Sequence, residues 1–203
     1  MQPSSSPLLS SPKLSTLIVC ILIFSTLSFA APPNRVTAPI VATQTVRLAA
    51  GVPMQARPEF DQGAVDPSLK MTVTLLTEPS ASQQRALTKL LADQQNPGSG
   101  SYHKWLTPEE YADRFGLSLS DVAKLTAWLQ SQGFSVVETA RGRNWIVFTG
   151  TAAQVEKSFQ TQIHNFKANG ETHFANTTSP STPGSVKNGR SGVRVGRASG
   201  SMR

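Results

Sequence analysis

Cysteine is almost absent from the chain. The 203-residue sequence holds a single cysteine, Cys20, which lies inside an apolar run near the N-terminus. A lipid-modified cysteine would instead follow small residues at the end of such a run, so we expect no lipid anchor. Removal of that run would leave a chain with no cysteine, which excludes disulfide bonds as a source of stability.

The sequence also lacks the short motifs that carry several common catalytic chemistries. It has no Gly-x-Ser-x-Gly elbow, no His-Glu-x-x-His, no Gly-rich phosphate loop and no Cys-x-x-Cys. Its histidines, His103, His164 and His173, are too widely spaced for a local metal motif, so we expect surface or hydrogen-bonding roles for them. Glu109 and Glu110 are adjacent on a predicted helix and point about 100° apart, so they do not form an acid–base pair. We therefore predict a chain that is not itself an enzyme and that holds neither metal nor cofactor.

Excess positive charge is confined to the two ends of the chain. The net charge is +7, but between residues 66 and 184 ten Lys or Arg balance ten Asp or Glu. The last 19 residues carry five basic and no acidic side chains, and the first 65 residues add a net +2. This distribution argues against a nucleic-acid recognition face on the folded core. The aromatic residues lack the Gly-Phe-x-Phe-type run of an RNA-binding sheet, and we interpret them as core packing.

An apolar, charge-free run occupies residues 14–29. It is shorter than the roughly 20 apolar residues that a transmembrane helix needs. It ends in Ser28-Phe29-Ala30, and small residues one and three positions before a scissile bond suit a signal peptidase. We predict a signal peptide over residues 1–30, cleaved between Ala30 and Ala31, and therefore a secreted or periplasmic protein with no stable membrane insertion. The alternative is an uncleaved membrane anchor.

The rest of the chain divides into three parts by composition. Residues 31–45 are rich in Pro, Ala and Thr and are predicted to form a linker. Residues 46–183 are predicted to form one folded domain, which begins with an irregular lead-in. Residues 184–203 contain Gly, Ser and Arg with almost no large apolar side chain, so we predict a basic, disordered tail.

Periodicity and capping signals predict the elements of this domain. In order, they are a strand at 69–75, helices beginning at Ser80, Thr107 and Ser118, strands at 134–139 and 144–149, a helix beginning at Thr151, and a strand at 162–166 that turns back at 168–170. Gly116 is expected to end the second helix in a left-handed conformation, and Gly142 to supply a positive φ between the two middle strands. The pattern predicts an α+β fold, a ferredoxin-like βαββαβ antiparallel sandwich with a small helical insert.

One stretch resembles a family signature, that of the activation domain of kumamolisin- and sedolisin-type serine peptidases. The residues that carry the resemblance are Tyr102, His103, Trp105, Leu106, Thr107, Pro108, Glu110, Tyr111, Phe115 and Gly116. Further stretches resemble the family in the same order along the chain, at 48–65, 128–134, 148–159 and 163–176. The resemblance covers about residues 46–183.

The resemblance implies a ferredoxin-like prodomain that packs against its peptidase, keeps it inactive and assists its folding. The peptidase domain, normally in cis, would be its partner. The family's catalytic module uses Ser, Glu and Asp with a calcium site, and none of these residues has a counterpart here, so calcium is expected only in that module. After Pro183 the sequence departs from the Ala- and Val-rich join of the relatives. We therefore expect a product that is truncated or frame-shifted before the peptidase.

Inhibition is expected to use the extended chain that follows Phe174. We predict that this segment lies along the substrate cleft as a strand-like plug. Its members are Ala175, Asn176, Thr177, Thr178, Pro180 and Pro183. Release in acid would follow if interface carboxylates lost their charge, and the candidates are Glu138, Glu156, Glu171 and Asp113. Two alternatives stay open: a free-standing secreted peptidase inhibitor, and a cationic nucleic-acid or surface-binding protein acting through the tail.

Overall fold

The computed structural model describes residues 32–36, 40, 45–47, 51–54, 56–168 and 170–184, together with the backbone of residues 192–195. The predicted signal peptide and the cleavage site at Ala30 and Ala31 lie outside the described residues, as does most of the predicted tail. Within the part of the chain that is described, no helix is both long and apolar enough to cross a membrane.

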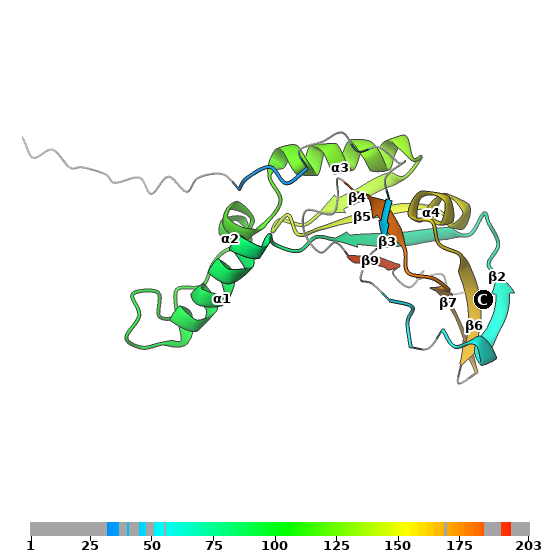
Figure 1. Ribbon diagram of the computed structural model, residues 1–203, viewed down its shortest axis with the longest axis horizontal. Helices are drawn as coiled ribbons and strands as arrows, with labels where there is room; N and C mark the ends of the chain where they lie inside the picture. The colour runs from blue at the N-terminus through cyan, green and yellow to red at the C-terminus, as the bar shows by residue number, and fades with distance from the viewer. Residues whose placement is uncertain are drawn as a thin grey trace, which may run out of the picture.

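A four-stranded antiparallel sheet forms the centre of the molecule (Figure 1). Its strands lie in the order β4 (Ser135–Thr139), β5 (Trp145–Thr151), β3 (Lys70–Leu76) and β9 (Gly192–Val195). β3 and β5 pair over their whole length, from Lys70 with Thr151 to Leu76 with Trp145. Alternate side chains therefore face opposite sides of this sheet. Met71, Val73 and Leu75 of β3 are fully buried on the side covered by helices.

In the part of the chain that the structure describes, four α-helices accompany the sheet, and their N-termini form as the sequence predicts. They are α1 (Ala81–Gln95), α2 (Pro108–Phe115), α3 (Leu119–Ser131) and α4 (Ala152–Phe159). Capping boxes at Ser80, Thr107 and Thr151 are all present, which confirms three local predictions. α3 and α4 cover one face of the sheet, whereas α1 and α2 extend beyond its end (Figure 1).

The core lies between the sheet and the helices α3 and α4. Leu125 and Leu129 of α3 and Val155 and Phe159 of α4 are nearly or fully inaccessible to solvent. Phe148 packs edge-on against Phe134, with 4.8 Å between ring centroids, and stacks with Phe159 at 5.9 Å. Truncation of a buried Phe to Ala typically costs about 3–5 kcal/mol, so these rings are a main source of stability. Core packing is thus the role of most, but not all, of the aromatic residues.

The strand predicted at 162–166 does not belong to the central sheet. It is β6 (Ile163–Ala168), which lies in a separate three-stranded sheet between β2 (Asp61–Ala64) and β7 (Glu171–Asn176). β6 and β7 form a hairpin that turns at Gly170, where φ is +81°. Both edges of β6 are therefore occupied, and the free edge of β3 pairs with β9 instead. The α+β class with antiparallel sheets is as predicted. The strand at 162–166 is also present as β6, but its expected place in the central sheet is wrong.

Two segments outside the expected domain body make contacts with it in the structure. Residues 192–195, within the tail predicted to be disordered, pair with Val73–Leu76 as β9. Arg35 and Val36, within the predicted linker, are buried, and their backbone N–H groups donate to the two carboxylate oxygens of Asp121 at 2.6 and 3.0 Å. A further short pair, β1 (Thr45–Arg47) with β8 (Ser181–Pro183), joins the start of the domain to its end.

Candidate functional site

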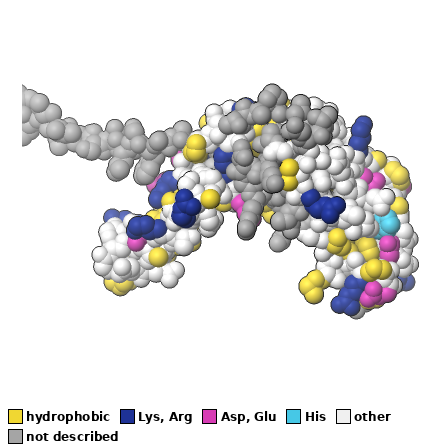
Figure 2. All heavy atoms as spheres, in the orientation of Figure 1, with side chains coloured by type: hydrophobic (Ala, Val, Ile, Leu, Met, Phe, Trp, Pro, Cys, Tyr) yellow, Lys and Arg dark blue, Asp and Glu magenta, His cyan; other side chains and the backbone are white. Residues whose placement is uncertain are grey.

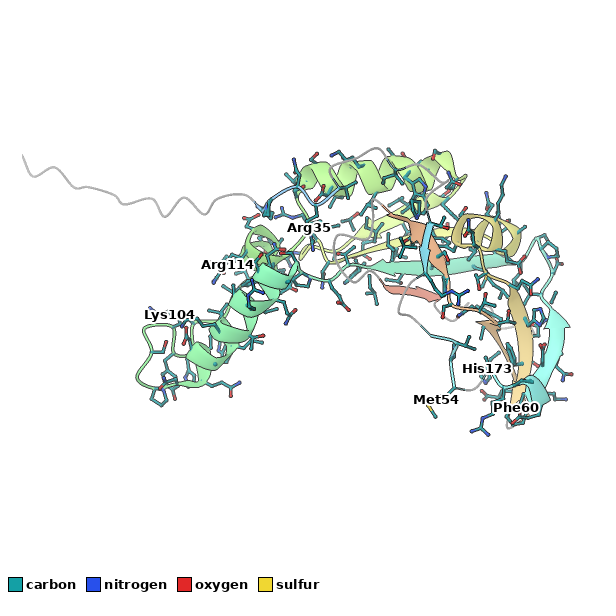
Figure 3. All side chains as sticks on the ribbon, viewed as in Figure 1. Arg35, Met54, Phe60, Lys104, Arg114 and His173 are labelled. Atoms are coloured by element: carbon teal, nitrogen blue, oxygen red, sulfur yellow. The ribbon has the colours of Figure 1, made fainter. Side chains whose placement is uncertain are left out.

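The helices α1 and α2 form an arm that projects from the central sheet, and its tip carries exposed aromatic side chains (Figures 1 and 3). The rings of Tyr102 and His103 stack with 3.8 Å between centroids, and His103 stacks with Trp105 at 6.1 Å. Trp105 is 65% exposed and Tyr102 is 38% exposed. The prediction of core packing is therefore wrong for these two residues, because the loop that bears them lies beyond the sheet and its helices. We call Tyr102, His103 and Trp105 the aromatic tip.

The remaining signature residues have architectural roles. Thr107 accepts the N–H of Glu110, and the Glu110 carboxylate accepts the N–H of Thr107, so this pair begins α2. Pro108 occupies the first turn, where its missing N–H costs nothing. The rings of Tyr111 and Phe115 lie 5.5 Å apart on one face of α2. Leu106, which is half-buried, precedes this helix.

Gly116 ends α2 for a reason that differs from the predicted one. Its φ is −74°, so the residue is not left-handed. A Cβ atom at this position would lie 2.5 Å from the backbone oxygen of Gly142 and 2.8 Å from that of Ala112. Glycine is therefore required by the close approach of α2 to the β4–β5 hairpin. In that hairpin the positive φ falls on Arg143, at +49°, and not on Gly142 as predicted.

Two ion pairs join the β4–β5 hairpin to α2. Arg141 donates to both carboxylate oxygens of Glu109, at 2.7 and 3.0 Å, and Arg143 donates to Asp113 at 2.6 Å. The hydrogen bond from Arg141 lowers the pKa of Glu109 below its usual range, and the same contact raises the pKa of Arg141. Glu109 is thus an ion-pair partner as well as a first-turn residue of α2. Sequence reasoning missed this pairing because the partners are 32 residues apart.

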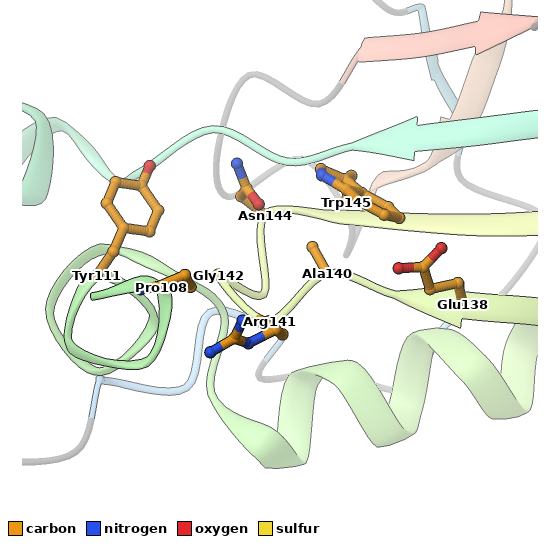
Figure 4. A pocket seen from close by; sticks show the side chains of 8 residues that line it. All are labelled: Pro108, Tyr111, Glu138, Ala140, Arg141, Gly142, Asn144 and Trp145. Atoms are coloured by element: carbon orange, nitrogen blue, oxygen red, sulfur yellow. The ribbon is translucent and has the colours of Figure 1, made fainter. Parts of the chain in front are cut away.

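A shallow hollow of about 440 Å³ lies where the hairpin meets α2 (Figure 4). Its lining includes Tyr111, Asn144 and Trp145 together with the charged residues Glu138 and Arg141. Arg141 points away from Glu138, because its guanidinium group is paired with Glu109 (Figure 4). The side-chain carboxylate of Glu138 has no ion pair or hydrogen bond to another described residue. The hollow therefore combines one unpaired carboxylate with two aromatic rings.

The other candidate carboxylates already have partners within the domain. Asp113 pairs with Arg143, and Glu156 accepts the N–H of Ile163 at 2.8 Å. Glu171 lies 3.4 Å from the imidazole of His173. Of the four carboxylates proposed for an acid-sensitive contact, Glu138 is therefore the one that the described structure leaves available.

The face of the central sheet opposite α3 and α4 is not covered by any described helix. Thr72, Thr74 and Leu76 of β3 and Trp145, Val147 and Thr149 of β5 point to this side and are exposed or half-buried. Together they make a mixed apolar and hydroxyl surface, which we call the open sheet face. Figure 2 shows the molecule hollowed between the arm and the three-stranded sheet. Lys104 lies on the loop of the arm, on the outer side of α1, and Met54 and Phe60 lie at the opposite end of the concave outline (Figure 3).

The segment at 175–183 is built into the domain. Asn176, Pro180 and Pro183 are buried, and Thr182 is completely inaccessible to solvent. The hydroxyl of Thr161 donates to the carbonyl oxygen of Thr178 at 2.8 Å, and the N–H of Thr177 donates to the carbonyl oxygen of Gln162 at 2.9 Å. Ala175, at the end of β7, is half-buried. The predicted cleft-blocking residues thus have intramolecular partners, and their role in a cleft stays a prediction.

The histidines are separate from one another. His164 contacts both carboxylate oxygens of Asp61, at 2.8 and 2.9 Å, and the pKa of Asp61 is lowered first by the backbone N–H of Gly63 and then by His164. His103 belongs to the aromatic tip, and His173 lies beside Glu171. Among the described residues no three His, Cys, Asp or Glu side chains are grouped so that they could hold a metal ion.

These observations define a small α+β domain with a concave side, bounded by an aromatic arm and a second sheet. The family model of the Pro-kumamolisin activation domain matches residues 60–194, so the chain belongs to this family. The match extends past residue 183 and includes most of β9.

Three curated proteins resemble the chain, and all are sedolisin-family peptidases. Xanthomonalisin of Xanthomonas sp. (strain T-22) is 37% identical over 139 residues, which is 66% of this chain and 16% of that protein. Aorsin of Aspergillus oryzae (strain ATCC 42149 / RIB 40) is 30% identical over half of this chain, and sedolisin of Pseudomonas sp. (strain 101) is 28% identical over half of it. The chain spans only 16–17% of the length of these relatives, in their N-terminal part.

Proposed function

We propose that this domain is the propeptide of a sedolisin-type serine peptidase, which it binds, holds inactive and helps to fold. The observation that carries the proposal is the match of residues 60–194 to the activation-domain family. The aligned relatives are peptidases in which the matching stretch is about one sixth of the protein. The partner in this proposal is the peptidase domain of such a precursor, and catalysis belongs to that domain.

The open sheet face is the surface proposed to receive the peptidase. It presents Leu76, Trp145 and Val147 beside threonine hydroxyls, a mixture typical of protein interfaces. The molecule has a concave outline between the arm and the three-stranded sheet, which suits a convex globular partner (Figure 2). Burial of this face would also remove half-exposed apolar surface from water, which favours association.

The chain after β7 is proposed to reach the substrate cleft, but not in its present arrangement. β8 pairs with β1 over three residues, and Thr182 has no solvent-accessible surface. Insertion of residues 175–183 into a cleft would therefore require β8 to separate from β1.

Release in acid is proposed to depend on Glu138. A carboxylate that accepts charge-assisted hydrogen bonds across an interface loses them when it is protonated. Glu138 lines the hollow together with Trp145 and pairs in register with Val147 of the open sheet face, and its carboxylate has no partner among the described residues. The bound state is therefore favoured at neutral pH and weakened as the pH falls.

Two finer points belong to the same proposal. We propose a ferredoxin-like fold with β9 rather than β6 as the last strand beside β3, and the strand order β4-β5-β3-β9 supports this proposal. We also propose export to the periplasm or the medium through the signal peptide at 1–30, with cleavage between Ala30 and Ala31.

The test is inhibition in trans. Residues 31–203 are mixed with the mature peptidase domain of the Xanthomonas relative, and hydrolysis of a peptide substrate is followed from pH 7 to pH 3. We expect inhibition at neutral pH with an inhibition constant of about 1 µM or below, the range of standard-size interfaces. We also expect faster recovery of activity when the denatured peptidase refolds in the presence of the domain. Absence of both effects at every pH would remove the proposal.

Glu138→Gln tests the acid release within the same assay. The variant is expected to inhibit less at neutral pH and to show a flatter pH dependence than the wild type. An unchanged profile would exclude Glu138 and leave the inhibitory role standing. Hydrolysis of the substrate by the domain alone would instead show that the chain is an enzyme.

A further inference from the structure

The aromatic tip is exposed because its rings do not pack into the core of the domain. Of the signature residues, Thr107, Pro108, Glu110 and Gly116 shape α2 and its contact with the hairpin. Single exposed apolar side chains are ordinary on protein surfaces. Three stacked aromatic rings on one loop, with Trp105 65% exposed, form a contiguous surface that calls for a binding role.

The loop that carries the aromatic tip is held in one conformation. Gln94 lies at the end of α1 and is only 3% exposed. Its backbone oxygen accepts the N–H of His103 at 3.1 Å, and its side-chain amide donates to the carbonyl oxygen of Lys104. His103 adopts a φ of +54°, an uncommon conformation that the two hydrogen bonds of Gln94 stabilise. Because the rings are fixed before any contact, binding them costs less conformational entropy.

The charge and position of the tip indicate which partner it fits. Residues 96–106 contain no acidic side chain and one basic one, Lys104, so the tip suits an apolar patch with a carboxylate beside it. The arm stands at one end of the concave outline of the molecule, and the three-stranded sheet stands at the other (Figures 1 and 2). A globular protein seated against the sheet would therefore meet the arm as well.

We propose that the aromatic tip is a second anchor for the peptidase domain, separate from the open sheet face and from any segment in the substrate cleft. This inference rests on the proposed function, because it takes the same peptidase as the occupant. In the relatives the stretch that matches this chain is 16–17% of the protein, so the peptidase would be attached in cis at high effective concentration. Tyr and Trp are frequent among residues that dominate binding energy, so Trp105 carries most of the contact.

The experiment compares matched truncations of exposed apolar side chains in the 31–203 chain. Trp105→Ala removes the anchor, Trp105→Phe keeps an aromatic ring, and Leu119→Ala is the control, since Leu119 is 72% exposed at the start of α3, on the helical side. Trp105→Ala is expected to raise the inhibition constant at neutral pH by about tenfold or more, as truncation of a dominant contact does. Trp105→Phe should retain most of the affinity, and Leu119→Ala all of it. The thermal midpoints of the variants should match that of the wild type.

A second readout separates docking from inhibition. Binding is measured by calorimetry to a peptidase whose nucleophile has been covalently blocked, and the same loss of affinity is expected for Trp105→Ala. If the wild type inhibits and Trp105→Ala binds equally well, the anchor is overturned and the proposed function stands. If the wild type neither binds nor inhibits, both are overturned. A change that appears only in self-association or in binding to anionic vesicles would assign the tip to a second copy or a membrane, and would also overturn the inference.

Discussion

At Gly116 the backbone of the chain comes too close to its neighbours to accept a side chain. A Cβ atom would lie 2.5 and 2.8 Å from two backbone oxygens, which cannot move aside as a flexible side chain could. Gly116→Ala is therefore expected to push α2 away from the β4–β5 hairpin and to lower the free energy of unfolding by about 1–3 kcal/mol, as overpacking does. The measurement is chemical denaturation at neutral pH.

Gly100→Ala is the matched control for this substitution. Nothing lies within 4 Å of a Cβ atom at Gly100, which is on the same arm, so its stability should change little. Equal stability of Gly116→Ala and the wild type would show that the hairpin accommodates the methyl group, and that the close approach does not explain the glycine in the signature.

Asp121 illustrates what residue-level reasoning could and could not find. A carboxylate in the first turn of α3 interacts favourably with the helix dipole, and Ser118 caps that helix as expected. Its carboxylate is nevertheless fully buried and accepts the N–H groups of Arg35 and Val36, about 85 residues away. The Pro- and Ala-rich sequence around Arg35 contains no pattern that predicts this contact. The side chain of Lys124 adds a bond to the Val36 carbonyl oxygen at 2.6 Å, so residues 35–36 are tied to α3 at three points.

At the scale of elements, local sequence signals predict where helices begin, but they do not predict which strands pair with each other. The capping boxes at Ser80, Thr107 and Thr151 depend on groups three residues apart, which the sequence displays directly. The partner of a strand depends on which edges are free in the folded molecule. β6 has strand character, but its hairpin with β7 and its pairing with β2 remove it from the central sheet. The pairing of β9 with β3 is equally invisible in the sequence. The stretch is short and flanked by Gly, Ser and Arg, so its composition is typical of a tail.

Removal of β9 tests its contribution to the sheet. A chain that ends at residue 190 loses four residues of antiparallel pairing with β3 and exposes the backbone of Val73–Leu76 as an edge. Four residue pairs of an antiparallel ladder share about four hydrogen bonds. At about 0.5–1.5 kcal/mol for each net hydrogen bond, we expect a loss of stability of roughly 2–6 kcal/mol. The exposed edge is also expected to promote self-association. Urea denaturation and sedimentation velocity measure the two effects.

The control for this truncation is a chain that ends at residue 196 and keeps β9. It should match the full-length protein in both assays. If the chain ending at residue 190 is as stable and as monomeric as the chain ending at residue 196, then β9 adds nothing to the sheet, and the ferredoxin-like assignment loses its last strand.

At the scale of the whole molecule, carboxylates with lowered pKa values link the fold to pH. The backbone N–H of Ser68 lowers the pKa of Asp66, that of Gly63 lowers the pKa of Asp61, and Arg141 lowers the pKa of Glu109. Each group binds a proton more weakly in the folded state than in the unfolded state. Its stabilising contribution is therefore present above the unfolded pKa, about 4, and is lost as the pH falls through the folded pKa. The contacts are spread over the lead-in, the second sheet and the arm, so acid weakens several parts of the domain together.

This distribution predicts that the domain becomes less stable under the acidic conditions in which the proposed peptidase is released. The urea midpoint should decline below about pH 5 and continue to fall toward pH 3. The triple variant Asp61→Asn, Asp66→Asn and Glu109→Gln should start from a lower midpoint at pH 7 and show a shallower decline, because these groups no longer titrate. Glu138→Gln, which removes a carboxylate without an intramolecular partner among the described residues, should follow the wild type. A triple variant whose midpoint falls as steeply as that of the wild type would place the acid sensitivity in other groups, and release would then depend on the interface alone.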